Sequence, residues 1–576
     1  MQTESLQKKL NARFHADLNV RIEDRSIFVS GTLNSWQEIV EACSMCVSKK
    51  PGWHVVNDIQ LSGVTMPKMR LPELEDQELE GKNPDVLIIG GGISGTSIAR
   101  ELMRYQLNVL LVDKEADVAL HASGRNDGEV HPGVDLARGT LKQKYVVRGN
   151  RMFDQVCREL DVPFQRCGQY VGFLDQKLYP ILAAYAWQRK HICGVDDTRL
   201  VSREELKQAE PHLNPEFRFA LYNPMAGSVC PYGLTIAYAE NAVQNGAEIS
   251  LNTAVTGMDV SNGRITAVHT NRGTVYPKIV INAAGVFAEE VARMAQDRFY
   301  SIHPRRGTNS IMDHKTAYLS EGVVSWKSMK KEHTHSKGGG IVHTVSDNLL
   351  VGPDAVETYE KENFATNPES IDTVFQKQNT TCPDLNRREI ITYFTGIRAA
   401  TFEEDFIIEE GRKTHNLIHV AGIQSPGLTT APAVAADVSH MAEQMLEHAG
   451  MNVRKNESFT PMRKGIPHMK DLPLKERDEM IRKNPDYGII ICRCEEVSKG
   501  EIIDAIHNPL GAVSVDSIKK RVRPGMGRCQ GGFCLPLIMQ IIAEEKHIPL
   551  EEVKKSGSRS WIACRKTKES GQDEAD

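Results

Sequence analysis

Four cysteines towards the C-terminal end have the spacing of metal ligands. Cys492 and Cys494 are separated by one residue, and Cys529 and Cys534 by four. Two short segments therefore supply four thiolates, a set that can hold an iron–sulfur cluster or a zinc ion. Zinc is the usual occupant of four cysteines when ligand type alone is considered, so these residues by themselves leave both metals open.

A glycine-rich turn near residue 90 has the pattern of a dinucleotide site. Gly90, Gly92 and Gly95 match G-x-G-x-x-G directly after the apolar run VLII, a helix is predicted to open at once, and Asp113 ends the next strand. This order of strand, turn, helix and strand is one βαβ unit. The helix N-terminus would face the phosphates, and Asp113 could accept hydrogen bonds from a ribose. The turn alone leaves FAD and NAD both open.

The elements that must position these residues form a mixture of helices and short strands. The predicted helices are Leu141 to Leu160, Pro231 to Gln244 and Ala431 to His448. The predicted strands are Ile265 to Asn271, Thr274 to Ile281 and Asn348 to Gly352. This mixture is typical of an α/β fold in which a nucleotide domain is interrupted by an antiparallel α+β substrate domain.

Length and composition narrow the class of protein further. The chain has 576 residues, of which 40% are hydrophobic and 25% charged, and its net charge is -5. This length predicts about three or four domains, and the absence of a basic excess argues against nucleic acid as a partner. Because no run of about 18 uncharged apolar residues occurs and Met1 to Leu10 is polar, we expect a cytoplasmic protein without a transmembrane segment. A peripheral membrane contact stays open.

The loop after the second strand resembles a known family, and this resemblance favours FAD over NAD. Residues 121–149, HASGRNDGEVHPGVDLARGTLKQKYVVRG, strongly resemble the cofactor loop of D-amino-acid-oxidase-like flavoproteins. The pattern from Gly124 to Gly133 looks like the anaerobic glycerol-3-phosphate dehydrogenase large subunit, and the segments GTLKQK and FQRCGQ are closer to L-2-hydroxyglutarate dehydrogenases. INAAG, GIR and AGIQSPGLT follow in family order. The resemblance covers residues 84–447 and implies FAD.

The glycine turn and the resemblance together imply which residues bind FAD. The small residues of NAAG let a strand end lie near the cofactor. The amides of Gly427 to Thr429 lead into a helix whose positive end suits the electron-rich edge of reduced flavin. The implied FAD-binding residues are Gly90, Gly92, Ile93, Ser94, Gly95, Asp113, Lys114, Ser123, Gly124, Arg125, Asn126, Val255, Ala284, Gly285, Gly427, Leu428 and Thr429.

The resemblance also implies two catalytic residues on the substrate side. His131 matches the family's histidine beside the flavin, and imidazole is suited to removing an alcohol proton. Arg398 matches the arginine that in relatives faces the substrate anion, and guanidinium offers a planar fork to carboxylate or phosphate. The alternatives are a structural histidine and an ion pair of Arg398 with Glu403 or Glu404. The chain has Asp135 and no tyrosine after His131, where both relatives usually carry tyrosine, so substrate identity does not transfer.

The segments around the four cysteines resolve the choice of metal by a second resemblance. ICRCEEVSKGEI and IKKRVRPGMGRCQGGFC closely resemble the bacterioferritin-associated-ferredoxin-like domain, and the one-residue first spacing agrees with it. The resemblance implies a [2Fe-2S] cluster on Cys492, Cys494, Cys529 and Cys534 rather than zinc. The basic residues that can offset the negative charge of the cluster are Lys519, Lys520, Arg521 and Arg523.

The chain before the glycine turn predicts a separate small domain. Residues 1–62 contain a helical start from Glu4 to Asn11, alternating strands and a helix from Ser35 to Lys49, and they resemble a BON domain. Cys43 and Cys46 form C-x-x-C on the second helix, which is more typical of helix packing than of a redox pair or a metal half-site. The remaining predicted segments are a linker at 63–83, a second linker at 448–487, the cysteine domain at 488–554 and a polar, disordered tail at 555–576.

These features predict an FAD-dependent dehydrogenase with a Rossmann-type FAD-binding domain. A one-electron centre beside a flavin favours a dehydrogenase over an oxidase, with electrons passing through the cluster to a redox protein or subunit. The expected substrate is a small anionic secondary alcohol, either glycerol 3-phosphate or a 2-hydroxy acid such as 2-hydroxyglutarate, and the product is the ketone. The alternatives are an amino- or imino-acid dehydrogenase and an electron-transfer subunit without its own substrate.

Overall fold

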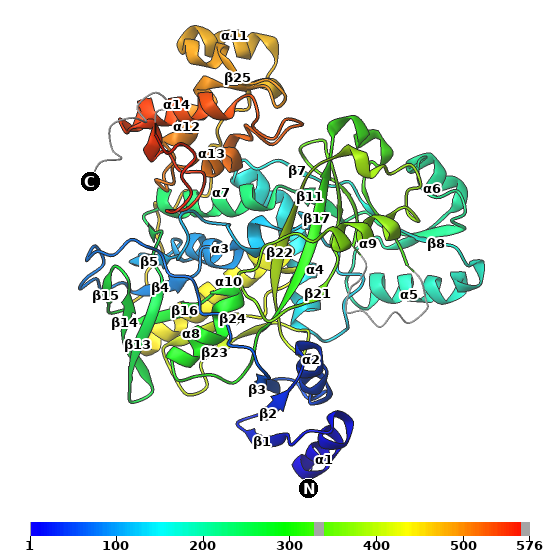
Figure 1. Ribbon diagram of the computed structural model, residues 1–576, viewed down its shortest axis with the longest axis vertical. Coiled ribbons are helices and arrows are strands. Elements are labelled where there is room, and N and C mark those ends of the chain that lie inside the picture. The colour runs from blue at the N-terminus through cyan, green and yellow to red at the C-terminus, as the bar shows by residue number, and fades with distance from the viewer. Residues whose placement is uncertain (1, 328–338, 566–576) are drawn as a thin grey trace, which may run out of the picture.

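The computed structural model describes residues 2–327 and 339–565 (Figure 1). A small N-terminal unit lies at one end of the longest axis and the cysteine domain lies at the other, with a two-part body between them. None of the helices in the described ranges is long and apolar enough to span a bilayer.

The first half of the body is built on a six-stranded sheet with both faces buried. Its strand order is β12 (Glu248–Ser250), β5 (Val109–Val112), β4 (Val86–Ile89), β16 (Ile279–Asn282), β24 (Leu417–Ala421) and β23 (Ile407–Glu410), and only β23 is antiparallel. Because side chains alternate along a strand, Val86 and Ile88 pack against helices on one face and Leu87 and Ile89 against a small sheet on the other.

Helices from distant parts of the chain cover the first face of this sheet. They are α3 (Ile93–Leu102), directly after the glycine turn, and α10 (Gly427–His448), and α4 (Leu141–Glu159) packs against α10. The prediction placed the start of α10 at Ala431, but the helix begins at Gly427. The backbone amides of Gly427 to Thr429 therefore form the first turn of α10, where N–H groups lack intrahelical partners.

The second half of the body is a nine-stranded, mainly antiparallel sheet. Two long paired strands, β17 (His303–Met312) and β22 (Ile390–Ala400), carry Arg305 opposite Arg398. The other strands are β8 (Gln169–Phe173), β9 (Arg199–Ser202), β10 (Phe219–Asn223), β18 (Val323–Trp326), β19 (Gly340–His343), β20 (Leu349–Gly352) and β21 (Val356–Glu357). The strand predicted at Thr274 to Ile281 is wrong, because two strands separated by Pro277 replace it: β15 (Gly273–Val275) and β16.

The N-terminal unit is a three-stranded sheet with two helices, α1 (Gln2–Phe14) and α2 (Trp36–Met45). Strand β1 (Asn19–Glu23) is antiparallel to β2 (Ser26–Leu33), and β3 (His54–Leu61) is parallel to β2. The unit is tied to the body, because the Val55 N–H donates to Glu403 Oε1 at 2.6 Å and Arg298 Nη1 lies 2.6 Å from Asp58 Oδ1. Arg412, between β23 and β24, also donates to the Asp24 and Gly52 carbonyls, so the unit contacts both halves of the body.

The cysteine domain contains two short strands, β25 (Ile490–Cys492) and β26 (Val497–Ser498), and three helices, α12 (Lys499–Ile506), α13 (Val515–Val522) and α14 (Leu535–Lys546). It docks on the body through a buried ion pair. Arg521 Nη1 lies 2.7 Å from Asp117 Oδ2, and the two side chains are 2% and 5% exposed. A charge-assisted pair buried to this extent fixes the domain against the nucleotide half.

Both segments predicted to be linkers make specific contacts with their neighbours. In the first, Leu79 is buried and Asp76 pairs with Arg272 at 2.9 Å. The second contains a helix, α11 (Leu474–Lys483). The prediction of a disordered tail does not hold for residues 556–565, because the Lys555 N–H donates to the Ser560 carbonyl at 2.7 Å. The rest of the tail, 566–576, lies outside the described residues.

Candidate active site

The glycine turn between β4 and α3 allows backbone segments to approach one another closely. Gly90 has a φ of +116°, and a Cβ atom there would lie 2.4 Å from the Ala283 carbonyl oxygen. A Cβ on Gly95 would lie 1.9 Å from the Gly90 carbonyl oxygen. Only glycine fits at both positions, as the dinucleotide pattern requires. The turn leads directly into the N-terminus of α3, the end of a helix that suits phosphates.

Asp113 lies at the end of β5 and braces the same turn. Its carboxylate accepts hydrogen bonds from the Gly91 N–H at 2.5 Å and from the Glu115 N–H at 2.8 Å. Burial raises the pKa of Asp113, and these two hydrogen bonds oppose that rise. A buried carboxylate beside the turn is placed to accept hydrogen bonds from ribose hydroxyls.

Most of the other implied FAD-binding residues line the same region, whereas Arg125, Asn126, Gly427 and Leu428 line the neighbouring cavity that His131 faces. The Ser123 hydroxyl accepts a hydrogen bond from the Ile93 N–H at 2.8 Å, and the Asn126 side chain donates to the Ala122 and Ser123 carbonyls at 3.0 Å. These bonds hold the loop of residues 120–127 against the start of α3. The turn cavity is lined by Gly90, Gly92, Ile93, Ser94, Asp113, Lys114, Ser123, Val255, Ala284 and Gly285 among others. A dinucleotide therefore fits the residues that the structure brings together here.

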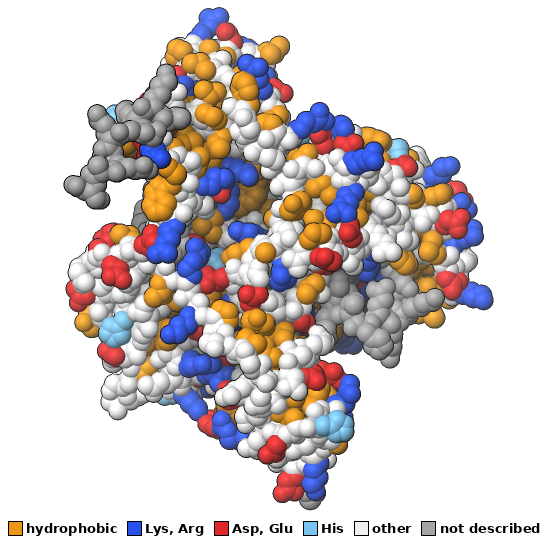
Figure 2. Space-filling view, in the orientation of Figure 1, with side chains coloured by type: hydrophobic (Ala, Val, Ile, Leu, Met, Phe, Trp, Pro, Cys, Tyr) orange, Lys and Arg blue, Asp and Glu red, His pale blue; other side chains and the backbone are white. Residues whose placement is uncertain are grey.

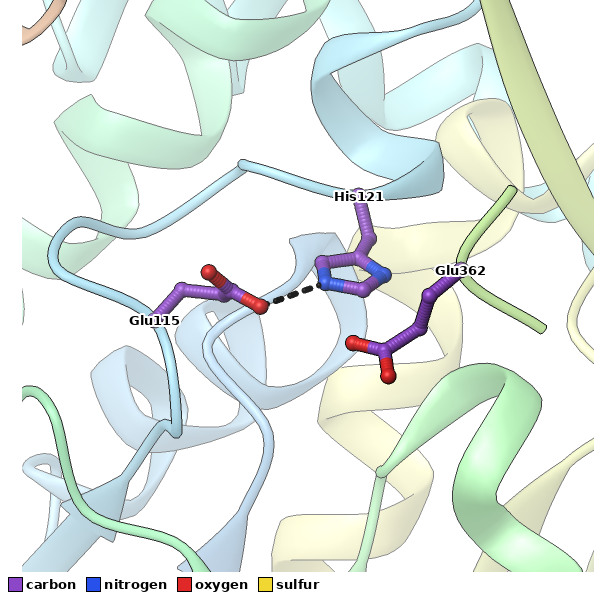
Figure 3. A group of neighbouring side chains, drawn as sticks. All are labelled: Glu115, His121 and Glu362. Carbon is purple, nitrogen blue, oxygen red and sulfur yellow. Dashed lines mark hydrogen bonds and ion pairs between the residues drawn. The ribbon is translucent and has the colours of Figure 1, made fainter. Parts of the chain in front are cut away.

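Lys114 belongs to a charged cluster that the sequence did not indicate. Figure 3 shows Glu115, His121 and Glu362 pointing toward one another, close enough to suggest a metal site. However, Lys114 Nζ lies 2.6 Å from both Glu115 and Glu362. Burial would raise the pKa of Glu115, but the His121 hydrogen bond and the charge of Lys114 hold it well below its ordinary value. The carboxylates already have cationic partners, so we assign no metal to this cluster.

His131 follows β6 (Glu129–Val130) and faces the second cavity of the body. Its Nδ1 lies 3.1 Å from Glu129 Oε1, and its Nε2 lies 3.3 Å from the Ser425 hydroxyl. The His131 N–H donates to the Thr429 hydroxyl at 2.9 Å, which ties the histidine to the first turn of α10. With its side chain 27% exposed, the imidazole can meet a ligand in the cavity.

Glu129 is a site residue that the sequence analysis missed. It is buried, and the Gln169 amide donates to its Oε1 at 2.8 Å. Gln169 in turn accepts from the Asn223 amide at 3.0 Å, and Asn223 accepts from the Thr198 hydroxyl at 3.0 Å. This chain of bonds fixes the carboxylate that orients His131. The E-x-H spacing places both side chains on one face of an extended strand, a signal that was available in the sequence.

Arg398 lies on β22 and lines the cavity that His131 faces. Both of its terminal nitrogens donate to the Asp354 carbonyl at 3.1 Å. The alternative of an ion pair with Glu403 or Glu404 is wrong, because Glu404 pairs with Arg305 at 2.6 Å and Glu403 accepts from Val55. Burial lowers the pKa of Arg398, which nevertheless stays charged as arginine does in proteins. Arg398 is half-buried and, within residues 2–327 and 339–565, has no carboxylate partner, so it is suited to hold a substrate anion.

The cavity between these two residues has the size of a substrate and flavin-ring site. Its volume is about 560 Å³, and Lys142, Arg305 and Gln424 also line it. It includes Gly427 and Leu428 at the positive end of α10, as the resemblance implies for the flavin edge. Asp135, where relatives usually carry tyrosine, lines the same cavity.

The four cysteines meet at one edge of the C-terminal domain. The Sγ atoms of Cys492 and Cys494 lie 3.8 Å apart, as do those of Cys494 and Cys529. The hydrogen bond with Cys534 lowers the pKa of Cys492 to about 5, which favours the thiolate form of a ligand. Among the described residues, no three of these sulfurs lie within 4.8 Å of one another. A tetrahedral zinc needs all four at about 3.8 Å from each other, so this open arrangement fits a two-iron cluster better.

The other C-x-x-C pair shows no sign of redox or metal chemistry. Cys43 and Cys46 are buried in the core of the N-terminal unit, beside Leu10 and Ile39. Burial raises the pKa of Cys43 well above its ordinary value and raises that of Cys46 to about 12. Both thiols are therefore protonated at neutral pH and serve helix packing.

Comparison with known proteins identifies the two main parts of the chain. Residues 85–441 match the family model "FAD dependent oxidoreductase", and residues 490–544 match "BFD-like [2Fe-2S] binding domain". A glycerol 3-phosphate dehydrogenase of Caloramator mitchellensis is 38% identical over 84% of this chain and 99% of its own length. A mitochondrial L-2-hydroxyglutarate dehydrogenase of Nematostella vectensis is 26% identical over 64% of this chain and 80% of its own.

A solved structure supports the cofactor directly. The FAD-bound L-α-glycerophosphate oxidase of Mycoplasma pneumoniae superposes with a TM-score of 0.60 at 26% identity, covering 66% of this chain and 98% of that one. Its bound FAD agrees with the dinucleotide turn and with the cavity beside it. The chain therefore belongs to the FAD dependent oxidoreductase family and carries a BFD-like [2Fe-2S] binding domain.

Proposed function

We propose that the protein oxidises glycerol 3-phosphate, or a 2-hydroxy acid such as 2-hydroxyglutarate, to the ketone. The observation that carries this proposal is the meeting of His131, backed by Glu129, and Arg398 in one cavity. An alcohol gives up hydride readily only when a base removes its hydroxyl proton, whereas an anion site selects phosphate or carboxylate. The relatives named glycerol 3-phosphate dehydrogenase and L-2-hydroxyglutarate dehydrogenase act on substrates of this class.

Each residue has a defined part in the proposed reaction. Bound FAD supplies the acceptor that takes a hydride from the alcohol carbon. His131 takes the hydroxyl proton on Nε2, while Glu129 holds Nδ1 and stabilises the imidazolium that results. Arg398 fixes the substrate anion so that the reacting carbon stays in place. The alcohol thus loses one hydride and one proton and becomes a ketone.

We further propose how the domains divide the work. The FAD-binding and substrate subdomains occupy residues 84–447 and the cluster domain residues 488–554. Cys492, Cys494, Cys529 and Cys534 would hold a [2Fe-2S] cluster, which would supply a one-electron centre able to pass electrons to a redox protein or subunit. Residues 1–62 form a BON-like domain, and 63–83 and 448–487 connect the domains. We place the protein in the cytoplasm.

The proposal is tested by a substrate screen under anaerobic conditions. Flavin absorbance is followed after addition of glycerol 3-phosphate, L-2-hydroxyglutarate, D-amino acids and proline in separate experiments. Bleaching by one of the two hydroxy compounds is expected. Bleaching only by an amino or imino acid would replace the proposal, and no bleaching by any of them would favour an electron-transfer subunit.

Arg398→Ala is expected to weaken apparent substrate affinity by about a hundredfold. A charge-assisted hydrogen bond to an anion contributes about 1.5–3 kcal/mol, and its loss acts mainly on binding. The measurement is stopped-flow flavin reduction across a substrate titration. Arg306→Ala is the matched control, because Arg306 lies on the neighbouring strand and pairs with the Ala365 carbonyl outside the substrate cavity. Equal effects of both variants would contradict the role of Arg398.

Glu129→Gln is expected to slow flavin reduction by about 10- to 100-fold with little change in substrate affinity. Glutamine keeps the shape of the side chain but cannot stabilise the imidazolium that forms when His131 accepts a proton. The limiting reduction rate and the apparent affinity are measured separately by stopped flow. Glu210→Gln, at a buried carboxylate bonded to the Gly322 N–H, serves as the control. A purely structural role for Glu129 predicts loss of FAD or of folding instead of a selective loss of rate.

A further inference from the structure

A third cavity lies between the cluster domain and the body. It is the largest of the cavities described here, with a volume of about 810 Å³. One wall is the loop of residues 120–127, whose other side lines the FAD and substrate cavities, and the facing wall is α13 with Met526 and Gln530. Figure 2 shows Lys and Arg side chains around a hollow between the upper domain and the body. We call this space the interdomain cavity.

Three cations face the interdomain cavity without a carboxylate partner. They are Lys519 and Lys520 on α13 and Arg125 on the loop. Within residues 2–327 and 339–565, no carboxylate oxygen lies within 4.0 Å of any of them. Asp117 and Asp516, whose charges act on the lysines, are already paired with Arg521 and Lys555. Of the other acids in the lining, Glu73, Glu115 and Glu362 pair with Arg559, Arg70 and Lys114, and Asp127 lies on the loop beside Arg125.

Both lysines are less easily protonated in this cavity than in water. Burial lowers the pKa of Lys520 to about 8 and also lowers that of Lys519. The charged form of both lysines is disfavoured by burial and by other cations nearby, Arg523 for Lys519 and Arg125 for Lys520. A bound polyanion would offset this cost, because a phosphate accepts hydrogen bonds from several cations at once.

A further part of the lining of the interdomain cavity, which we call its aromatic wall, consists of four aromatic rings. Phe364, Tyr393, Phe394 and Tyr232 line it, and the Arg125 guanidinium stacks 4.3 Å above the Phe364 ring centre. Flat apolar surfaces of this kind accept a planar ring by stacking. Cations from both the loop and α13, next to a group of aromatic rings in a space of this size, match a ligand with a phosphate at one end and a planar ring at the other.

We propose that the interdomain cavity binds a nucleotide, with its phosphate on Arg125, Lys519 and Lys520 and its ring against the aromatic wall. This nucleotide is distinct from FAD, whose turn and ring site lie in the two other cavities. It would lie between the flavin-binding loop and the cluster domain. The inference does not depend on which alcohol the enzyme oxidises.

The test is calorimetric titration of the full chain, loaded with FAD and cluster. Flavin mononucleotide and ADP are the two probes, because one carries an isoalloxazine ring and the other adenine, and inorganic phosphate is the third. One of the two nucleotides is expected to bind saturably, one per chain, at least tenfold more tightly than phosphate. Lys519→Gln and Lys520→Gln are each expected to weaken that binding about tenfold, as the loss of a charged hydrogen bond does.

Lys546→Gln is the matched control, because Lys546 lies at the exposed end of α14 and outside the cavity lining. Absence of saturable binding by both nucleotides would overturn the proposal. So would phosphate binding as tightly as either nucleotide, or an equal effect of Lys546→Gln. Substrate-driven flavin bleaching is recorded on the same samples, so failure here is separable from failure of the proposed function.

Discussion

Replacing His131 by alanine is expected to slow substrate-driven flavin reduction by about 10² to 10⁴, the contribution of a positioned base. The imidazole lies in the cavity with Arg398, and its far nitrogen is held by Glu129 at 3.1 Å. Alanine removes the proton acceptor but leaves the arginine that holds the anion. FAD content and substrate affinity should therefore change little, and stopped-flow reduction under anaerobic conditions separates rate from affinity.

The control for this prediction is a histidine outside the cavity. His440→Ala is suitable, because His440 is 61% exposed and pairs only with Glu443 three residues along α10. It should reduce its flavin at the parental rate. A His131→Ala enzyme that also keeps the parental rate would remove the histidine from the mechanism, and the base would then have to lie elsewhere in the substrate half of the body.

The parts of the fold that could be predicted are those whose signals are local. The glycine turn was predicted together with its strands and helix, since the turn, the apolar run and Asp113 lie within a few dozen residues of each other. Helix Pro231 to Gln244 was predicted to the residue. The error at Thr274 to Ile281 has a physical cause: an alternating pattern continues across Pro277, but β16 joins the parallel sheet through partners far along the chain.

The parts of the site that escaped prediction depend on contacts between distant segments. His131 and Arg398 were implied one at a time by a resemblance, but they come from just after β6 and from β22, which lie far apart along the chain, and only the tertiary fold brings them to one cavity. The interdomain cavity depends even more on contacts between distant segments. Arg125 and Lys520 meet there because Arg521 anchors the cluster domain on Asp117, and no pattern along the chain records that docking. Tertiary packing determines which charges pair across domains. The periodic pattern of hydrophobic residues along the sequence predicts helices and strands but not this packing.

The fixed position of the cluster domain bears on how electrons leave the flavin. Besides the Arg521 and Asp117 pair, Arg528 lies 2.7 Å from Asp313, and the Tyr232 hydroxyl donates to the Met526 sulfur at 3.3 Å. These contacts join the segment between α13 and Cys529 to both halves of the body. The cysteine site is therefore held in one position against the body. Its outer edge, with Cys494 and Cys529 exposed, is left to meet an acceptor.

Cys529→Ser is accordingly expected to remove the cluster entirely and to leave FAD in place. Serine lacks the soft thiolate that iron prefers, and three remaining ligands do not complete the two-iron set. Iron and acid-labile sulfide should fall from about two of each per chain to a small residue, while flavin content is unchanged. Substrate should still bleach the flavin, because the cysteine lies outside the substrate cavity. Reoxidation by a one-electron acceptor should fail.

Cys564→Ser is the matched control for this loss, since Cys564 is an exposed cysteine outside the ligand set. It should keep iron, sulfide and electron transfer to the acceptor. Stoichiometric zinc without iron, in parental protein prepared anaerobically from iron-replete cells, would refute the cluster. That outcome would also conflict with the sulfur positions, because zinc would require the chain of thiols from Cys529 through Cys494 to Cys492 to close into a tetrahedron. Loss of flavin bleaching in Cys529→Ser would instead show that the cluster and substrate sites are not separable.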